Sequence, residues 1–295
     1  MVLLFRRLAT WLVLAAALAI PPRADAAPPL PLRIDFIDVG QGDSALLRSS
    51  TGKTVLIDGG PKVSGPAVIE LLRERHVVAL DLVILTHRHA DHLGGLAQVI
   101  RAVKVQTFLD AELPYPSSAY DRLVKTLRAR HVPVRQARRG RTIDIGGGAT
   151  ITLLGPPDPP INRSRSDVNA NSVVARVDYR KVGVLFAADA EPETERWLLT
   201  SGAQLPAQIL KVAHHGGRYS STEQFLRVVR PLAAVISVGT FNNHKHPTPE
   251  TLARLDALPA HVYRTDQDGT VTVETDGTRI EVTTARGKRE ILNAR

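Results

Sequence analysis

The strongest constraint on the fold of this chain is a short apolar run that ends in a dense group of histidines and an aspartate. Residues 82–85, Leu-Val-Ile-Leu, are predicted to form a strand buried on both faces. Four potential metal ligands follow within six residues, namely His87, His89, Asp91 and His92. Chance would produce this pattern in roughly one chain in a thousand. The sequence therefore predicts a metal site at the end of a buried strand.

The metal ligands must be nitrogen and oxygen atoms, because the chain contains no cysteine. A disulfide framework and a cysteine nucleophile are excluded for the same reason. Alternate residues that leave a strand share a face, so His87 and His89 can aim at one ion, while Asp91 and His92 can face a second. Imidazole and carboxylate suit Zn²⁺, with Mn²⁺ as the alternative. The competing interpretation is a polar loop whose histidines only cap a helix.

The rest of the 295 residues alternates strands and helices in two similar runs. With 43% hydrophobic residues and no long linker, the chain can form one large α/β unit. Helices are predicted at 64–75, 93–103, 120–130, 191–199, 222–229 and 249–258, with strands at 32–38, 53–57, 132–136, 150–154, 172–179, 182–188, 208–213, 233–238, 261–263, 270–274 and 279–283. We expect two similar halves packed sheet on sheet, with a surface loop at 156–171.

The N-terminal residues are predicted to be a targeting signal and not part of the folded domain. Arg6 and Arg7 precede an apolar run at 8–20, and Ala24-Asp25-Ala26 resembles a cleavage site. The run is shorter than the roughly 20 residues of a spanning helix, so we expect a signal peptide over 1–26 and a secreted or periplasmic protein without a transmembrane domain. An uncleaved anchor is the alternative. Residues 27–31 form a Pro-rich lead, and 285–295 are expected to be a basic tail.

Positive charge is concentrated in one segment. The chain carries a net charge of +9, and residues 121–142 alone hold eight basic residues against one acid: Arg122, Lys125, Arg128, Arg130, Arg135, Arg138, Arg139 and Arg141. A basic stripe at about the spacing of a helix face suits phosphate backbones or an anionic membrane surface. The alternative is an ordinary solvated face in an Arg-rich chain.

The motif His-x-His-x-Asp-His after an apolar strand resembles the metallo-β-lactamase fold superfamily. The resemblance implies an αββα four-layer sandwich over residues 32–284 and a pair of divalent ions, Zn²⁺ first. It also implies that Asp58 orients ligands, that Asp189 bridges the two ions, and that His214 or His215 is a late ligand.

Further strings narrow the resemblance to the hydrolase domain of the ComEC competence proteins. They include Asp38-Val-Gly-Gln-Gly-Asp43, Asn169-Ala-Asn171-Ser, Lys211-Val-Ala-His-His-Gly216 and His246-Pro247. In that family the domain is the extracytoplasmic part of a DNA-uptake channel and is associated with degradation of the strand that is not transported. The channel's membrane helices and oligonucleotide-binding domain have no counterpart here, so a free-standing, exported version is expected.

The chain departs from the superfamily pattern in two ways. No histidine occurs between His131 and His214, and Asn169 or Asn171 stands where a third histidine of the first metal is expected. The first ion is therefore expected to be held more weakly than the second. The usual glycine before the bridging aspartate is Ala188. Because consecutive strand residues point in opposite directions, only one of the late histidines is expected to be a ligand.

The expected mechanism follows from the two ions. Ions about 3.5 to 4 Å apart lower the pKa of a shared water to near 7 and produce a metal-bound hydroxide. Asp91, Asp189 and His246 are the candidate catalytic residues. His244, with His246, is expected to hold a phosphate or donate to a leaving oxygen, or else to lie in an exposed loop. Gln41 and Asp43 are expected over the site, or only in a turn, and Lys211 near it.

The leading hypothesis is a metal-dependent phosphodiesterase or DNA nuclease with a role in DNA uptake and single-stranded DNA as substrate. A second hypothesis is hydrolysis of a small-molecule ester or lactam. A third is a non-catalytic nucleic-acid or envelope-binding protein that keeps a metal for structure, which would require a closed set of four ligands per ion.

Overall fold

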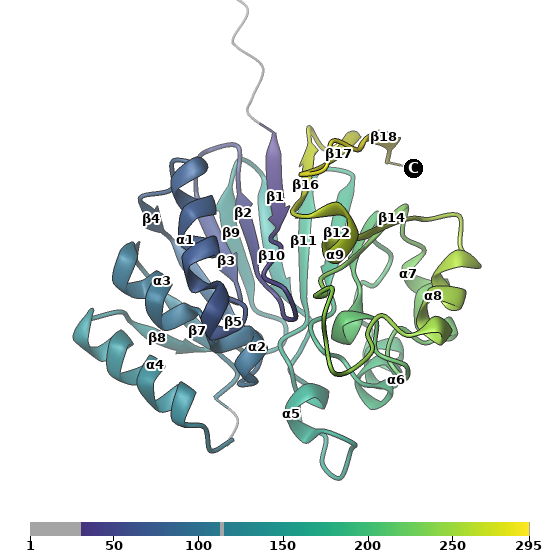
Figure 1. Ribbon diagram of the computed structural model, residues 1–295. Helices are drawn as coiled ribbons and strands as arrows, with labels where there is room; N and C mark the ends of the chain where they lie inside the picture. The colour runs from purple at the N-terminus through teal and green to yellow at the C-terminus, as the bar shows by residue number, and fades with distance from the viewer. Residues whose placement is uncertain (1–30, 113–114, 295) are drawn as a thin grey trace, which may run out of the picture.

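The computed structural model describes residues 31–112 and 115–294, which form two facing β-sheets with helices on both outer sides (Figure 1). The predicted signal peptide and all of the Pro-rich lead except Pro31 lie outside the described residues. Within the described part, none of the helices combines the length and the apolar composition needed to span a bilayer.

The first sheet has nine strands in the order β18-β17-β16-β1-β2-β3-β5-β7-β8. Its pairs are antiparallel from β18 to β3 and parallel from β3 to β8. The bounds are β1 Leu32–Phe36, β2 Ala45–Arg48, β3 Thr54–Ile57, β5 Leu82–Leu85, β7 Phe108–Asp110, β8 Val134–Gln136, β16 Val271–Thr275, β17 Arg279–Thr284 and β18 Arg289–Asn293. Strands β4 (Ala79–Leu80) and β6 (Lys104–Val105) form a small separate pair.

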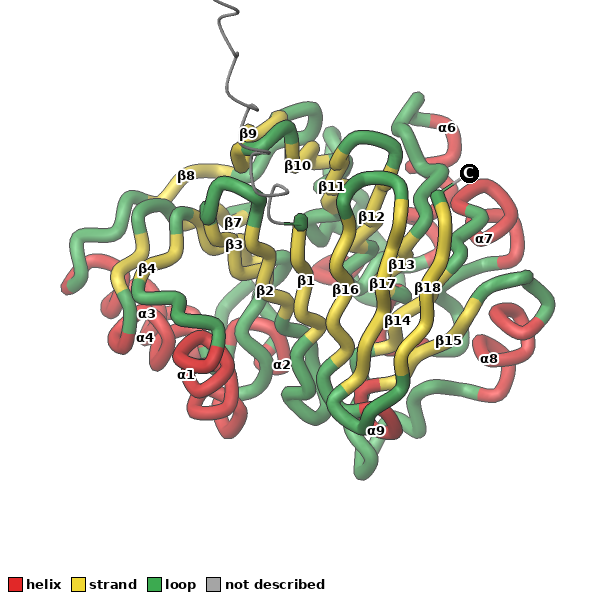
Figure 2. Tube along the Cα trace, turned by 90° about the horizontal axis from the view of Figure 1, so that it is seen from above, coloured by secondary structure: helices red, strands yellow, loops and turns green. Residues whose placement is uncertain are grey.

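The second sheet has seven strands in the order β15-β14-β13-β12-β11-β10-β9. Strands β9 to β12 pair antiparallel, and β12 to β15 pair parallel. The bounds are β9 Thr142–Gly146, β10 Ala149–Leu153, β11 Ala175–Tyr179, β12 Val182–Phe186, β13 Ile209–Lys211, β14 Ala233–Ile236 and β15 His261–Arg264. Figure 2 shows the two sheets from above.

Helices cover the outer face of each sheet, which gives four layers (Figures 1 and 2). The longer helices are α1 Gly65–Glu74, α3 Leu96–Ala102 and α4 Ser118–Ala129 on the first sheet, and α6 Pro192–Thr200, α7 Glu223–Val229 and α8 Pro249–Asp256 on the second. Short elements are α2 Ala90–Leu93, α5 Asp167–Ala170, α9 Thr265–Asp268, η1 Lys62–Ser64 and η2 Ala213–Gly216. The expected αββα sandwich is confirmed.

Three apolar clusters hold the layers together, one between the sheets and one under each helix layer. Between the sheets, Phe36 of β1 stacks on Phe186 of β12 with ring centroids 5.6 Å apart. On α4, Leu123 and Leu127 lie four residues apart and are buried, because that spacing places both on one helix face. Burying each of these side chains contributes about 2 kcal/mol.

Three expectations need correction. Residues 285–295 are not a basic tail, because β18 pairs with β17 over Arg289 to Asn293 and forms one edge of the first sheet. The two halves are not sequential, since β16 to β18 return to the first sheet beside β1. The basic segment is not one helix face: Arg122, Lys125 and Arg128 lie on α4, and Arg135 lies on β8. The backbone turns at 130–133 and separates them.

Candidate metal centre

The candidate ligands lie at the carboxyl ends of strands from both sheets, where the loops of the two sheets meet. Asp58 follows β3, His87 follows β5, and Asp189 follows β12. The late histidines lie in η2, directly after β13. Because the carboxyl ends of neighbouring parallel strands lie at the same edge of a sheet, residues far apart in the chain converge there.

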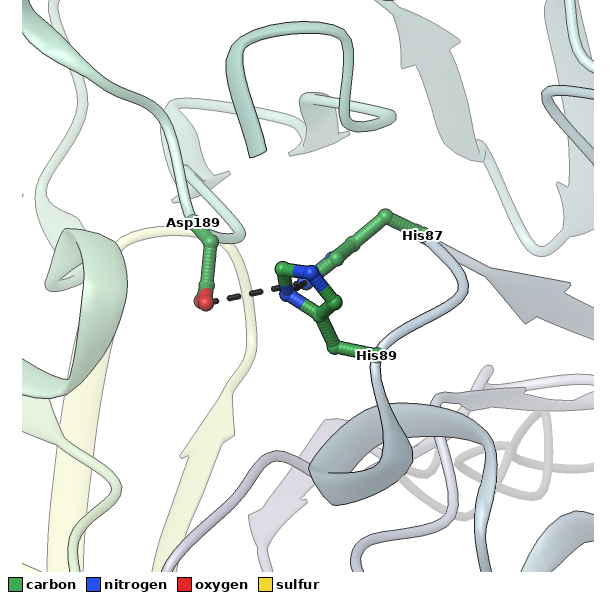
Figure 3. Close-up of side chains that lie close together, drawn as sticks. All are labelled: His87, His89 and Asp189. Atoms are coloured by element: carbon green, nitrogen blue, oxygen red, sulfur yellow. Dashed lines mark hydrogen bonds and ion pairs between the residues drawn. The ribbon is translucent and has the colours of Figure 1, made fainter. Parts of the chain in front are cut away.

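The first cluster consists of His87, His89 and Asp189 (Figure 3). His87 Nε2 lies 3.6 Å from Asp189 Oδ2 and 3.1 Å from His89 Nδ1. His87 and Asp189 are almost fully buried, whereas His89 is partly exposed. One ligand atom from each of the three residues lies within 4.8 Å of the others, so they can bind one ion.

The second cluster consists of Asp91, His92 and His215. His215 Nε2 lies 3.3 Å from Asp91 Oδ2, and His92 Nε2 lies 3.3 Å from Asp189 Oδ1. The side chains of His92 and His215 are buried, and that of Asp91 is 30% exposed. This cluster therefore has a buried floor and one side open to solvent.

Asp189 lies between the two clusters and turns one oxygen toward each. Oδ2 faces His87 at 3.6 Å and His214 at 3.7 Å. Oδ1 faces His92 at 3.3 Å and His215 at 3.6 Å. A carboxylate placed in this way can bridge two cations.

Buried polar atoms without partners indicate that these residues fit divalent ions. Among the described residues, His92 Nε2, His215 Nε2 and Asp189 Oδ1 form no hydrogen bond. Asp189 Oδ1 faces the two nitrogens at 3.3 and 3.6 Å without forming a hydrogen bond, and a divalent cation between these atoms would supply the missing interaction. Imidazole nitrogens and carboxylate oxygens are ligands for both Zn²⁺ and Mn²⁺, so the residues of this centre fit a divalent metal ion of either type.

The electrostatics favour positive charge at this position. Burial opposes the charged form of His92, but Asp189 and Asp58 raise its pKa well above the ordinary value. Burial would raise the pKa of Asp189, but the charges of His92 and His215 hold it well below its usual range. A bound cation would take the place of these protons.

Asp58 fixes the orientation of His92 from beneath. Its Oδ2 lies 2.8 Å from His92 Nδ1 and accepts from the Thr86 hydroxyl at 2.7 Å, and its Oδ1 accepts from the Thr86 backbone at 2.8 Å. Because Nδ1 of His92 is held, Nε2 faces Asp189. The Thr86 hydroxyl also lies 3.1 Å from His87 Nδ1. The sequence pattern did not identify Thr86 as a site residue, although Thr86 directly precedes the motif that begins at His87.

Asp43 and Lys211 form a buried ion pair beneath His215. Lys211 Nζ donates to Asp43 Oδ2 at 2.6 Å, and Asp43 Oδ1 lies 3.3 Å from His215 Nδ1. Burial raises the pKa of Asp43, but Lys211 and His215 outweigh this and lower it to about 2. Asp43 thus lies against two ligand histidines, 3.3 Å from His215 and 4.0 Å from His92. Gln41 accepts from the Gly239 backbone at 3.3 Å and lines the hollow beside Asp91.

Both late histidines face the site, so the expectation that they point in opposite directions is wrong. Strand β13 ends at Lys211, and His214 and His215 have left-handed φ values of 49° and 55°, so the alternation of a strand does not apply. His214 Nδ1 lies 3.3 Å from Glu191, which the sequence reasoning missed although it lies two residues after Asp189. Ala188 adopts a φ of 48°, in the region where glycine is usual.

The two asparagines have different roles. Asn169 is buried, and its Nδ2 lies 3.4 Å from His214 Nε2 and from Glu191 Oε1, at the edge of the first cluster. Asn171 points away from the site: its amide donates to the Ile161 and Asp167 carbonyls at 2.7 Å each. The proposed site role of Asn171 is therefore wrong, because its side chain ties down a loop.

The late loop carries His246 at the rim. Its ring centroid lies 5.4 Å from that of His214 and 6.4 Å from that of His215. Burial, together with the charges of these two histidines, lowers the pKa of His246 to about 4, so it is neutral at pH 7. His244 is exposed and lines a hollow of about 590 Å³ beside Asp91, together with Gln41.

The fold and this centre define a known class. Residues 37–240 match the family described as the metallo-beta-lactamase superfamily, and the chain belongs to that superfamily. The solved structure of Zn²⁺-bound PqqB from Methylobacterium extorquens is similar in fold, with a TM-score of 0.52 and 13% identity over 80% of this chain and 88% of that one.

Two curated bacterial proteins are similar to most of this chain. The chain is 28% identical over 257 residues to ComE operon protein 3 of Bacillus subtilis, which covers 81% of this chain and 32% of the relative. It is 30% identical over 266 residues to Recombination protein 2 of Haemophilus influenzae, which covers 87% of this chain and 30% of the relative. The chain therefore spans about a third of the length of these relatives.

Proposed function

We propose that this protein is a metal-dependent phosphodiesterase that cleaves DNA, with two Zn²⁺ ions, or Mn²⁺ in their place. The placement of Asp189 between the two ligand clusters carries this proposal, because phosphodiester hydrolysis commonly uses such a pair of ions. The name of one relative, Recombination protein 2, favours DNA over other esters.

The residues would divide the work as follows. His87, His89 and Asp189 would hold one ion, and Asp91, His92 and His215 the other. When bound, the pair would activate a water and stabilise charge on the phosphoryl oxygens. His246 lies beside His214 and His215, where a ring N–H could hydrogen-bond to the leaving oxygen. The partial exposure of Asp91 and His89 supports catalysis over a closed structural site, since substrate can reach the ligands.

We further infer that the catalytic domain is a single unit that begins at residue 32. We also infer that residues 1–26 direct export of the protein to the periplasm or the medium. The apolar run with arginines before it and a small-residue cleavage site after it supports export. N-terminal sequencing of protein from the extracytoplasmic fraction tests this, and a start near Ala27 is expected. An intact Met1 in a membrane fraction would contradict it.

The activity is tested with purified, metal-loaded protein. We expect hydrolysis of bis-p-nitrophenyl phosphate and of a single-stranded oligonucleotide, both lost on chelation and restored by Zn²⁺ or Mn²⁺. A panel with a lactone, a phosphocholine ester and a β-lactam serves as the comparison. Turnover of one of these without any phosphodiester cleavage would overturn the nuclease proposal, and two bound ions without any turnover would favour a binding protein.

A further inference from the structure

Three exposed aromatic side chains stand on the loops around the metal centre. Among residues 31–112 and 115–294, the exposed tyrosine, phenylalanine and tryptophan side chains are Tyr115, Tyr219 and Phe241, at 38, 48 and 97%. Most of the other large apolar side chains of the described chain are buried in its cores. We call these three residues the aromatic rim. Their relevance comes from their contacts, because Tyr115 packs on the candidate ligand His89 and Tyr219 contacts Arg165.

Each ring of the aromatic rim is connected to a different side of the centre. Tyr115 meets His89 edge to face, with centroids 5.4 Å apart. Tyr219 carries the Arg165 guanidinium 3.8 Å above its ring. Arg165 Nε in turn lies 3.9 Å from Glu191 Oε2.

Phe241 belongs to the loop that carries His246. The Asn242 side chain donates to the carbonyls of Gly239 and His246 at 2.9 and 2.8 Å, and so holds this loop closed. A ring exposed by 97% therefore projects from a loop of defined shape.

A positively charged groove runs beside the second cluster. The hollow of about 590 Å³ that contains Asp91 and His244 is also lined by Lys62, Arg101 and Arg122, which come from η1, α3 and α4. In the described part of the chain, no carboxylate lies within 4.0 Å of these three cations, whereas many other surface arginines are paired. We call these three residues the phosphate groove.

We propose that the aromatic rim stacks the nucleobases next to the scissile phosphodiester and that the phosphate groove binds the backbone on one side of it. This inference rests on the proposed function and names the residues that would select the substrate. Base faces are available for stacking only in an unpaired strand, whereas a duplex hides them. Three unpaired cations match a polyanion. The site would therefore prefer an unpaired strand without preference for its sequence.

Binding of oligonucleotides to the metal-loaded full chain tests this directly. The probes are a fluorescein-labelled dT₁₂ with phosphorothioate linkages, which resist cleavage, and an abasic 12-mer with the same linkages and charge. We expect the wild type to bind dT₁₂ at least tenfold more tightly than the abasic strand. The rim variant Tyr219→Ala/Phe241→Ala should bind both probes with similar affinity. Its content of bound Zn²⁺, measured by elemental analysis, should equal that of the wild type.

Matched controls separate stacking and charge from general effects. Val134→Ala/Ile291→Ala removes two exposed apolar side chains, at 40 and 51%, from edge strands β8 and β18 and should leave dT₁₂ binding unchanged. The groove variant Lys62→Gln/Arg101→Gln/Arg122→Gln should lower the slope of log affinity against log salt by about 2, since each phosphate contact in a single strand contributes about 0.7. The control triple Lys125→Gln/Arg128→Gln/Arg130→Gln, from the same basic segment, should change this slope by less than half as much.

The results distinguish this inference from the proposed function. Equal affinity of the wild type for dT₁₂ and the abasic strand, or a rim variant that binds dT₁₂ like the wild type, would overturn the inference while leaving phosphodiesterase activity intact. Absence of any phosphodiester cleavage by the wild type would overturn the proposed function, whatever the binding results.

Discussion

The two ligand clusters are supported differently, although they share Asp189. In the second cluster, Nδ1 of His92 is held by Asp58 at 2.8 Å, and Nδ1 of His215 lies 2.9 Å from the Ser237 carbonyl and 3.3 Å from Asp43. In the first cluster, His87 is supported only by the Thr86 hydroxyl, and His89 lies at the surface beside Tyr115. A ligand whose far nitrogen is held by a carboxylate is better oriented and more basic. The second cluster should therefore bind its ion more tightly.

Removing the shared carboxylate should break both clusters at once. Asp189→Asn keeps the size of the side chain but removes its charge and one of its two oxygens, so the side chain could no longer serve both ions. We expect activity on bis-p-nitrophenyl phosphate to fall by on the order of a thousandfold or more, with metal content reduced. Elemental analysis and kinetics measure this. Retention of two ions and substantial activity would contradict the assigned bridging position.

Breaking the buried ion pair between Asp43 and Lys211 should lower the folding stability and thereby weaken metal binding at the second cluster. Lys211→Met leaves the Asp43 carboxylate buried without its partner, which costs about 3–5 kcal/mol of folding free energy. Chemical denaturation measures the loss. The double variant Asp43→Asn/Lys211→Met should recover most of the stability while metal binding at His215 stays weakened. A stable single variant would mean that the pair contributes little.

Asp58→Asn should weaken the second ion selectively. The amide keeps the shape of the side chain but cannot hold His92 as a carboxylate does, so affinity for the tighter ion should fall 10- to 100-fold. Metal titration measures this. Asp110→Asn is the matched control, because Asp110 is a buried carboxylate held by Arg88 and Tyr120 at a neighbouring strand end. An equal metal loss in both variants would indicate a general effect on folding.

The two late histidines should separate the clusters. His215→Ala should remove about one ion per protein, since His215 Nε2 lies among the ligand atoms of the second cluster. His214→Ala should keep that ion and weaken the other by about tenfold, because His214 faces the same Asp189 oxygen as His87. Elemental analysis across a range of free Zn²⁺ measures both. Equal metal loss in the two variants would contradict the distinction.

The smallest effect concerns Glu195, which supports the loop after η2. Its carboxylate accepts from the backbones of Ser221 and Thr222 at 2.5 and 2.8 Å. Burial raises the pKa of Glu195 to about 7, from an ordinary 4.5. Folding thus favours its protonated form, and this stabilisation, on the order of 2 kcal/mol, is lost as the pH rises through 7.

Melting temperatures measured from pH 5 to 8 test the Glu195 effect. Wild type should lose stability over this range relative to Glu195→Gln, which cannot ionise. Glu193→Gln on the same helix is the control and should run parallel to the wild type. A constant difference between Glu195→Gln and wild type would contradict the assigned titration.

The sequence alone determined the type of fold and the chemistry of the centre. Apolar runs followed by charged residues marked the strand ends, and the motif from His87 to His92 placed four potential ligands on the loop after β5 and on α2. Such features are local, because the direction of a side chain at a strand end depends on a few neighbouring dihedral angles.

Only the tertiary structure decided which distant side chains meet. Asp43 and Lys211 pair across 168 residues because the turn between β1 and β2 of the first sheet meets the end of β13 in the second sheet. The left-handed backbone at His214 and His215 turned both rings toward Asp189, and Asn171 was drawn into a loop instead. The last strand, β18, pairs with β17 and forms one edge of the first sheet. These outcomes depend on the packing of two sheets, which no local pattern of residues specifies.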